Sequence, residues 1–303
     1  TGVANTPPVA NNQSLGTNED IALAVTLTAT DVDGNPLTYA VVTPPAHGAL
    51  TGIAPNLSYT PASNYNGADS FTFKANDGSA DSNVATINLT INSVNDVPSF
   101  TKGGNPTVLE DAGAQSVPGW ATAISAGPAD ESGQTLNFIV SNNNNSLFSS
   151  QPAIAANGTL TYTPAANANG LATVTVQIHD NGGTANGGVD TSSTQTFTIT
   201  VTAVNDAPVA ANDSYSVAKN TTLTVTVPGV LGNDTDIENN PLTAVKVTDP
   251  AHGILTLNSN GSFSYLPTAE YLGSDSFTYK ANDGLLDSNV ATVTITITGV
   301  ANT

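Results

Sequence analysis

The segment Ser70-Phe-Thr-Phe-Lys-Ala-Asn-Asp-Gly78 decides the fold of this chain. It returns almost unchanged as Ser276-Phe-Thr-Tyr-Lys-Ala-Asn-Asp-Gly284. In both copies apolar and polar residues alternate, and this period of two predicts a strand with one buried face. The Asn-Asp-Gly ending predicts a tight turn. The chain therefore contains copies of one small β unit rather than a single large domain.

The same alternation occurs elsewhere, together with turn signals. It runs through Ile87-Asn-Leu-Thr-Ile91, Phe197-Thr-Ile-Thr-Val201 and Val293-Thr-Ile-Thr-Ile297. Turn pairs such as Asn157-Gly158 and Asn260-Gly261 separate such segments, and no window shows a helical period. Short strands with regularly spaced turns predict an all-β chain of sandwiches with essentially no helix.

Two short linkers divide the chain into three predicted units. Val94-Asn-Asp-Val-Pro98 and Val204-Asn-Asp-Ala-Pro208 each follow a predicted strand directly, and a linker that ends in Pro is short and stiff. The units are 1–94, the divergent 95–204 and 205–298, with 299–303 as the start of the next linker. Since the first six residues return as the last six, we also expect a longer polypeptide with a period of 303 − 6 = 297 residues.

The composition excludes several classes of function. There are 24 acidic residues against 5 basic ones, all Lys, which gives a formal charge of −19. Nucleic acid is excluded as a partner because phosphate binding needs a basic patch. The chain has no Cys, so thiolate metal sites and cysteine nucleophiles are excluded as well. It has no apolar run of the length that a bilayer requires, so we expect no membrane insertion in this segment.

Three motifs together resemble one known family. Ala29-Thr-Asp-Val-Asp-Gly-Asn-Pro-Leu-Thr-Tyr39, the Lys-Ala-Asn-Asp-Gly segments and the Val-Asn-Asp-x-Pro linkers are similar to bacterial cadherin-like and Ig-like tandem repeats. Such repeats, of the VCBS and RTX-adhesin types, form the stalks of large surface adhesins. The resemblance implies three tandem Ig/cadherin-like Greek-key β-sandwiches arranged end to end, an extracellular or cell-surface location and no enzymatic activity. It also implies Ca²⁺ at the junctions between domains.

The residue types at the junctions fit that implication. Ca²⁺ prefers six to eight oxygen ligands from carboxylates, amides and carbonyls. The family pattern is an early Glu, an Asn-Asp linker, an Asp-x-Asp loop and an Asp-Gly loop. It gives for the first junction Glu19, Asn95, Asp96, Asp130, Glu131 and Asp180, and for the second Glu110, Asn205, Asp206, Asp234, Asp236 and Asp283.

Two further observations qualify the metal hypothesis. Asp31, Asp33 and Asp77 can bind a weaker ion on their own in the first unit, or can serve only as turn residues. Lys219 stands where the first unit has Glu19, and the linker in 299–303 has no Asp. Because an ammonium group repels a cation, we expect no Ca²⁺ between the third unit and the one that follows.

The sequence thus predicts a non-catalytic repeat segment of a surface adhesin, whose partners are neighbouring repeats of the same polypeptide. One alternative is a filament in which chains associate laterally through exposed strand edges. Another is a carbohydrate- or protein-binding module in the second unit, with Trp120 as a sugar platform. Trp120 can equally be a core residue of a sandwich.

Overall fold

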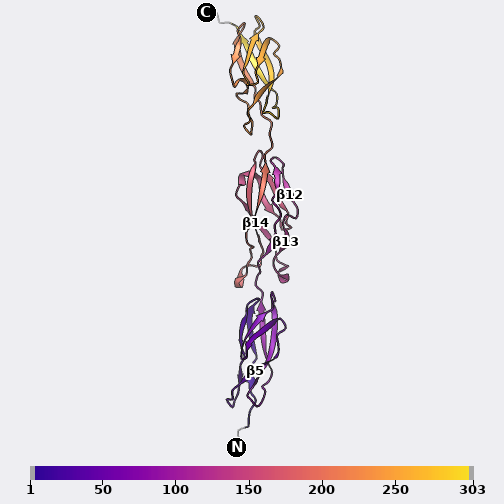
Figure 1. Cartoon of the computed structure of the whole chain (residues 1–303), viewed down its shortest axis with the longest axis vertical. Helices are drawn as coiled ribbons and strands as arrows, with labels where there is room; N and C mark the ends of the chain where they lie inside the picture. Colours follow the sequence, from indigo (N-terminus) through magenta and orange to yellow (C-terminus); the bar gives the residue numbers. More distant parts are fainter. Residues whose placement is uncertain (1–3, 300–303) are drawn as a thin grey trace. The chain divides into compact units, whose positions relative to one another are not determined.

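The computed structural model describes residues 4–299. The predicted all-β fold is confirmed, since the described residues form strands and short 3-10 turns and contain no α-helix. The strands form three sandwiches; Figure 1 labels β5 in the first and β12, β13 and β14 in the second. Of the repeated terminal hexapeptide, residues 1–3 and 300–303 lie outside the described residues, and with them most of the linker predicted at 299–303.

The first sandwich has one sheet in the order β2-β9-β8-β5, a second in the order β3-β7-β6 and a short pair β1-β4. Among its described strands, only the pairs β8-β9 and β6-β7 join strands that are consecutive in sequence, so the chain crosses repeatedly between the sheets, as in a Greek key. β2 pairs with β9 in parallel, and the other pairs are antiparallel. The strands are β1 (Val9–Ala10), β2 (Gln13–Asn18), β3 (Leu23–Thr26), β4 (Ala29–Thr30), β5 (Thr38–Thr43), β6 (Gly48–Ile53), β7 (Asn56–Pro61), β8 (Gly67–Asn76) and β9 (Ala85–Asn92).

The third sandwich repeats this topology, with sheets β19-β25-β24-β21 and β20-β23-β22. β19 runs parallel to the last strand β25, as β2 does to β9, with Asp213 opposite Val293 where the first sandwich has Gln13 opposite Ile87. The elements are β19 (Asp213–Ala218), β20 (Leu223–Val225), η4 (Gly229–Leu231), β21 (Thr243–Thr248), β22 (Gly253–Leu257), β23 (Phe263–Pro267), β24 (Gly273–Asn282) and β25 (Ala291–Thr298).

The second sandwich keeps the two sheets, in the orders β11-β18-β17-β14 and β12-β16-β15, with a short pair β10-β13. It contains three 3-10 turns, where the third sandwich has one and the first has none among its described residues. The elements are β10 (Ser99–Thr101), β11 (Thr107–Leu109), β12 (Gln115–Val117), β13 (Thr122–Ser125), η1 (Ala129–Glu131), β14 (Asn137–Asn142), η2 (Asn145–Leu147), β15 (Phe148–Ile154), β16 (Leu160–Pro164), β17 (Gly170–His179), η3 (Ala185–Gly187) and β18 (Gln195–Thr202).

The chain divides into two compact units. The first comprises the chain up to Pro106 together with Gly113–Thr163 and Leu171–Thr200. The second comprises Thr107–Ala112, Pro164–Gly170 and the chain from Val201 onward. Residues of the second sandwich thus belong to both units. The boundaries predicted at 94/95 and 204/205 stay predictions.

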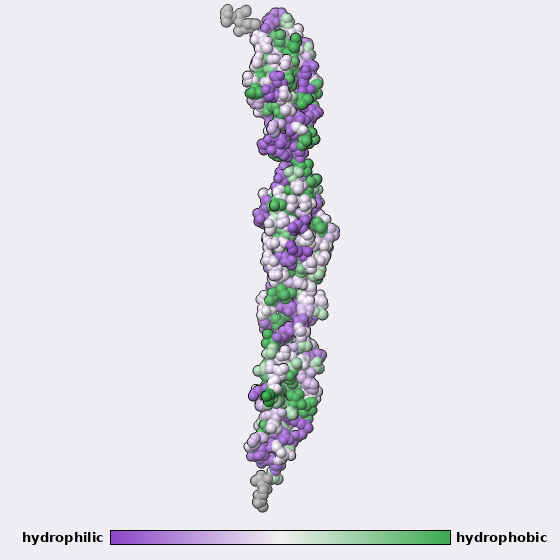
Figure 2. Space-filling model, viewed as in Figure 1, coloured by the Kyte–Doolittle hydropathy of each residue, from purple (hydrophilic) through white to green (hydrophobic). Residues whose placement is uncertain are grey.

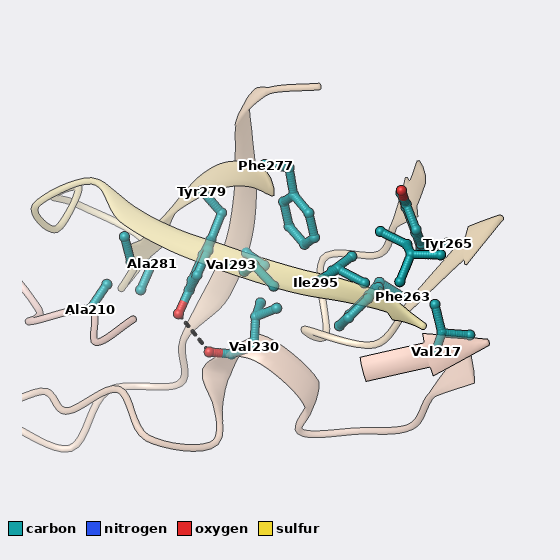
Figure 3. Packing of buried hydrophobic residues seen from close by; sticks show 13 residues of the cluster. Ala210, Val217, Val230, Phe263, Tyr265, Phe277, Tyr279, Ala281, Val293 and Ile295 are labelled. Atoms are coloured by element: carbon teal, nitrogen blue, oxygen red, sulfur yellow. Dashed lines mark hydrogen bonds between the residues drawn. The ribbon is translucent and has the colours of Figure 1, made fainter. Parts of the chain in front are cut away.

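Each core is built from the alternating face that the sequence shows. In β8, Phe71 and Phe73 are buried, and in β24 Phe277 and Tyr279 are buried. Figure 3 shows the third core, where Tyr279, Phe277, Val293 and Ile295 pack together and the Tyr279 hydroxyl donates to the Val230 carbonyl. On the visible face hydrophilic and hydrophobic residues are interspersed (Figure 2). The alternation of apolar and polar residues along the strands therefore determines which side chains form the core.

The Pro-Ala-His-Gly repeat has a structural cause. In the first sandwich the buried Asp69 accepts hydrogen bonds from the Tyr59 hydroxyl and from the backbone N–H groups of Ala46 and His47 at 2.8–2.9 Å. A Cβ atom on Gly48 would lie 2.4 Å from the Tyr59 ring. Asp275 and Tyr265 repeat the arrangement in the third sandwich. The motif fixes a hairpin onto the core and needs glycine for the close approach.

Candidate metal centres

The Asn of each predicted linker is hydrogen-bonded to an Asp at the start of a glycine-containing loop. The side-chain amide of Asn95 donates to Oδ1 of Asp180 at 3.0 Å, and its backbone carbonyl accepts from the N–H of Val189. The same amide–carboxylate bond is found in each sandwich: Asn5–Asp77 at 2.9 Å, Asn95–Asp180 at 3.0 Å and Asn205–Asp283 at 2.8 Å. The linker Asn is thus fixed by the sandwich that follows it.

The early Glu fixes the same linker from the preceding sandwich. Glu19 is 4% exposed, and its Oε1 accepts from the backbone N–H of Val94 at 2.5 Å. Glu110 is 3% exposed and accepts from the backbone N–H of Val204 at 2.7 Å. Asn169 donates to its second oxygen at 3.1 Å. Both Glu residues therefore hold the chain where the linker begins.

At the first junction several carboxylates lie close together, all within the first compact unit. Oε1 of Glu131 accepts from the backbone N–H of Asp96 at 2.7 Å, and Asp130 accepts from the Asn66 amide at 2.7 Å. Burial raises the pKa of Asp96 above its usual value, and the charges of Asp20 and Asp130 raise it further. This crowding of negative charge disfavours the ionised form of the Asp96 carboxyl group.

Glu131 experiences the same crowding. Burial is the largest cause that raises its pKa, and Asp96, Asp130 and Asp180 add to it, while the hydrogen bond from the Asp96 N–H acts in the opposite direction. The Glu131 side chain also occupies the space next to Gly127 that any larger residue at position 127 would fill. A Cβ atom on Gly127 would lie 1.6 Å from Oε2 of Glu131.

The second junction lies within the second compact unit. Asp236 accepts at Oδ1 from the backbone N–H of Asn240 at 2.7 Å. Asp206, Asp236 and Asn167 line a cavity of about 310 Å³. The predicted ligand Asp234 lines a separate cavity of about 290 Å³ together with Asp236. Both its carboxylate oxygens are 3.0 Å from the Tyr279 hydroxyl oxygen of the third sandwich.

Glu238 was missed by the sequence reasoning. In the first sandwich Asp31 accepts from the N–H of Asn35, as Asp236 does from Asn240, so Asp31 corresponds to Asp236. Asp33 then corresponds to Glu238, not to Asp236. The alignment of Asn35-Pro36 with Asn240-Pro241 is the signal in the sequence that identifies this register.

Buried carboxylate oxygens without a hydrogen-bond partner are the observation that bears on a metal. They occur at both junctions and at the corresponding loop of the first sandwich. They are Oε2 of Glu19, Oε2 of Glu131, Oδ2 of Asp180, Oδ2 of Asp206, Oδ2 of Asp236, Oε2 of Glu238 and Oδ2 of Asp31. Such oxygens are costly to bury unpaired, and they are the hard donors that Ca²⁺ prefers. The donor chemistry at both junctions therefore fits Ca²⁺.

The donors are nevertheless not assembled into a finished cluster. Among residues 4–299, no group of three or more Asp, Glu or His side chains forms a ready-made metal site. A bound ion would have to draw these side chains together. The predicted ligand sets stay predictions.

Asp31, Asp33 and Asp77 of the first sandwich show features of both hypotheses made for them, a weaker ion site and turn residues. Asp77 accepts at Oδ1 from the N–H groups of Ser79 and Ala80 at 2.7 Å, as a turn residue does. Asp33 accepts from the N–H of Thr6 at 2.7 Å. Oδ2 of Asp31 remains buried and unpaired.

Trp120 is a core residue. It is 5% exposed, its ring centroid lies 4.3 Å from that of Phe197, and its indole N–H donates to the Gly104 carbonyl at 2.9 Å. A sugar platform needs an exposed ring face, so Trp120 does not provide one.

The fold and the linkers define a chain of tandem β-sandwich repeats. The chain belongs to the bacterial Ig domain family, which matches residues 5–90 and 95–202, and residues 205–299 match the bacterial cadherin-like domain. These domains are typical of extracellular adhesion-type proteins. The predicted family is thereby confirmed.

One known protein is similar in sequence, and solved structures agree with the fold. The chain is 29% identical over 262 residues to integrin beta-like protein A of Dictyostelium discoideum, over 74% of this chain but only 13% of that protein. Mouse cadherin-23 EC22-24 is similar with a TM-score of 0.55 and 18% identity, over 98% of this chain and 100% of that one. Protocadherin gamma B2 domains 1-5 give a TM-score of 0.52 and 14% identity, over 98% of this chain and 61% of that one. In the described part of the chain no helix is long and apolar enough to cross a membrane.

Proposed function

We propose that this chain is a non-catalytic repeat segment of a long extracellular surface adhesin, stiffened by Ca²⁺ at its two junctions. The observation that carries the proposal is the set of buried, unpaired carboxylate oxygens at both junctions. Its partners are neighbouring repeats of the same polypeptide. The segment gives reach and mechanical strength.

The residues that would hold the ions at each junction are the early Glu of the preceding sandwich, the Asp of the linker and loop carboxylates of the following sandwich. At the first they are Glu19, Asp96, Asp130, Glu131 and Asp180, and at the second Glu110, Asp206, Asp236, Glu238 and Asp283. A bound Ca²⁺ neutralises the crowded carboxylates and satisfies their free oxygens. The hydrogen bonds of the early Glu and of the linker Asn already restrain the linker on both sides.

A filament is the second candidate function. The edge strand β5 exposes Val41 and Val42, and the edge strand β21 exposes Val245 and Val247. Open strand edges with exposed apolar side chains favour lateral pairing of chains. Electron microscopy of the native material would distinguish single strings from an ordered fibre.

Thermal unfolding in Ca²⁺ and in EDTA tests the proposed function. An ion that binds only the folded chain stabilises it by about 2.7 kcal/mol at a hundredfold excess over the dissociation constant. We expect the double variant Asp96→Ala/Asp206→Ala to lose this rise in melting temperature. The matched control is Asp81→Ala/Asp287→Ala, which removes the same charge from residues paired with Lys74 and Lys280. An equal melting temperature of the parent chain in Ca²⁺ and EDTA would contradict the proposal.

A further inference from the structure

Lys219 occupies the place of the early Glu in the third sandwich. Its backbone N–H donates to the carbonyl of Thr298, the last residue of the final strand, at 2.8 Å. Glu19 and Glu110 make the same bond to the last residue of the final strand in their own sandwiches, each at 2.9 Å. The equivalence deduced from the sequence is therefore present in the backbone.

The residues next to Lys219 have changed with it. Asn220 has φ +61°, as Asp20 has φ +58° in the first sandwich. Oδ1 of Asn220 accepts from the N–H of Glu270 at 3.0 Å, as Oδ1 of Asp20 accepts from the N–H of Asn64 at 3.2 Å. Asn64 and Glu270 share the left-handed conformation, at φ +54° and +64°. Three positions thus differ while the backbone is kept: Glu to Lys, Asp to Asn and Asn to Glu.

As a result of these three changes, the carboxylate charge at this end of the third sandwich is balanced by a side chain of the same sandwich. The Lys219 ammonium donates to one carboxylate oxygen of Glu270, and the Asn220 amide donates to the other at 2.7 Å. The hydrogen bond from Lys219 is the main cause that holds the pKa of Glu270 below its usual value. In the first sandwich the same end carries two carboxylates, Glu19 and Asp20, and Oε2 of Glu19 is buried and unpaired.

We propose that the Lys219–Glu270 ion pair takes the place of a divalent cation at this end of the third sandwich. This inference rests on the proposed function, because it assigns Ca²⁺ to the other two ends only. The turn at residues 219–223 is then held closed with or without metal, and it responds to ionic strength instead of to a chelator. The chain therefore contains two kinds of sandwich end, one sensitive to Ca²⁺ and one insensitive to it.

Lys219→Ala in the full chain tests the inference, with Glu19→Ala as the matched variant. Hydrogen exchange of the turns and calorimetric Ca²⁺ titration are both measured. For Lys219→Ala we expect faster exchange at 219–223 and 268–272 in Ca²⁺ and in EDTA alike, with an unchanged number of bound ions. For Glu19→Ala we expect fewer bound ions and a loss of protection only in Ca²⁺. The inference is overturned if Lys219→Ala reduces Ca²⁺ binding as Glu19→Ala does, or leaves exchange in EDTA unchanged.

A transplant of the ion pair gives a second, constructive test. The triple variant Glu19→Lys/Asp20→Asn/Asn64→Glu copies the third end onto the first sandwich. We expect it to lose the ions of the first junction and to protect its turn in EDTA as well as the third sandwich does. Unchanged Ca²⁺ binding by this variant would overturn the inference. If the parent chain binds no Ca²⁺, the proposed function fails, while exchange of Lys219→Ala in EDTA still decides whether the ion pair holds the turn.

Discussion

Both carboxylate oxygens of Asp234 lie 3.0 Å from the hydroxyl oxygen of Tyr279, deep in the third sandwich. The same hydroxyl is 2.6 Å from the carbonyl of Val230 and 3.3 Å from Oδ2 of Asp213. A phenol has one proton, and the carbonyl is its nearest acceptor. The contacts of the hydroxyl oxygen with the carboxyl groups of Asp234 and Asp213 become favourable only when one of these two groups carries a proton that it can donate.

The first prediction is that mild acid stabilises the third sandwich. Burial is the main cause that raises the pKa of Asp213 to about 6, and the charge of Asp234 adds to it. A folded pKa above the usual 3.8 favours the folded state at low pH, and this contribution is lost as the pH rises through about 6. In EDTA we expect the free energy of unfolding to fall by about 1 kcal/mol between pH 5 and pH 7, after discounting for partial exposure.

Asp213→Gln is the control for that prediction, because Gln13 holds the corresponding position in the first sandwich. The variant should be more stable than the parent at pH 7, and its pH profile between 5 and 7 should be flatter. Denaturant unfolding at each pH measures both effects. A parent chain that is more stable at pH 7 than at pH 5 would contradict the assignment.

The second prediction concerns the glycine that admits the linker Asn. A Cβ atom on Gly182 would lie 1.7 Å from Oδ1 of Asn95. We expect Gly182→Ala to displace Asn95, to destabilise the chain by about 1–3 kcal/mol and to weaken Ca²⁺ binding at the first junction. Gly133→Ala is the matched control, because nothing lies within 4 Å of its added Cβ atom. Calorimetric titration of both variants measures the difference, and equal affinities would count against a role of Asn95 in the site.

The third prediction separates a core role of Trp120 from a binding role. Because Trp120 packs on Phe197 and its indole N–H is paired with Gly104, Trp120→Ala should destabilise the second sandwich by about 3–5 kcal/mol. Denaturant unfolding measures this loss. If the Trp120→Ala chain instead keeps its stability but no longer binds to glycans on an array, the hypothesis of a carbohydrate-binding module would be supported.

The fold could be predicted from the sequence because its signals are local. Alternation in segments such as Ser276-Phe-Thr-Tyr279 decides which face is buried, whatever the rest of the chain does. The family pattern placed Asn95 and Asp180 in one predicted ligand set, and the structure brings the two side chains within hydrogen-bond distance. The contact between Asn66 and Asp130 could not be predicted, because it joins residues 64 positions apart in sequence through side chains alone.

The choice of the loop ligand in the third sandwich could not be settled from the sequence, for a different reason. The segment Asp234-Thr-Asp-Ile-Glu238 contains two acidic pairs with the same spacing, so spacing alone does not fix the register. Burial decides it: Asp234 turns into the sandwich towards Tyr279, while Glu238 leaves an unpaired oxygen. Which acidic residue faces the core is a property of the packed domain and not of the loop sequence.

The fourth prediction follows from this register. In a chain whose first junction is silenced by Asp96→Ala, Glu238→Gln should abolish the remaining rise in melting temperature on Ca²⁺ addition, because it removes a free carboxylate oxygen at the second junction. Asp234→Asn is the matched charge-removing variant. Both oxygens of Asp234 face Tyr279, so this variant should change the melting temperature in EDTA but keep the Ca²⁺-induced difference. Loss of that difference in Asp234→Asn with its retention in Glu238→Gln would return the ligand role to Asp234.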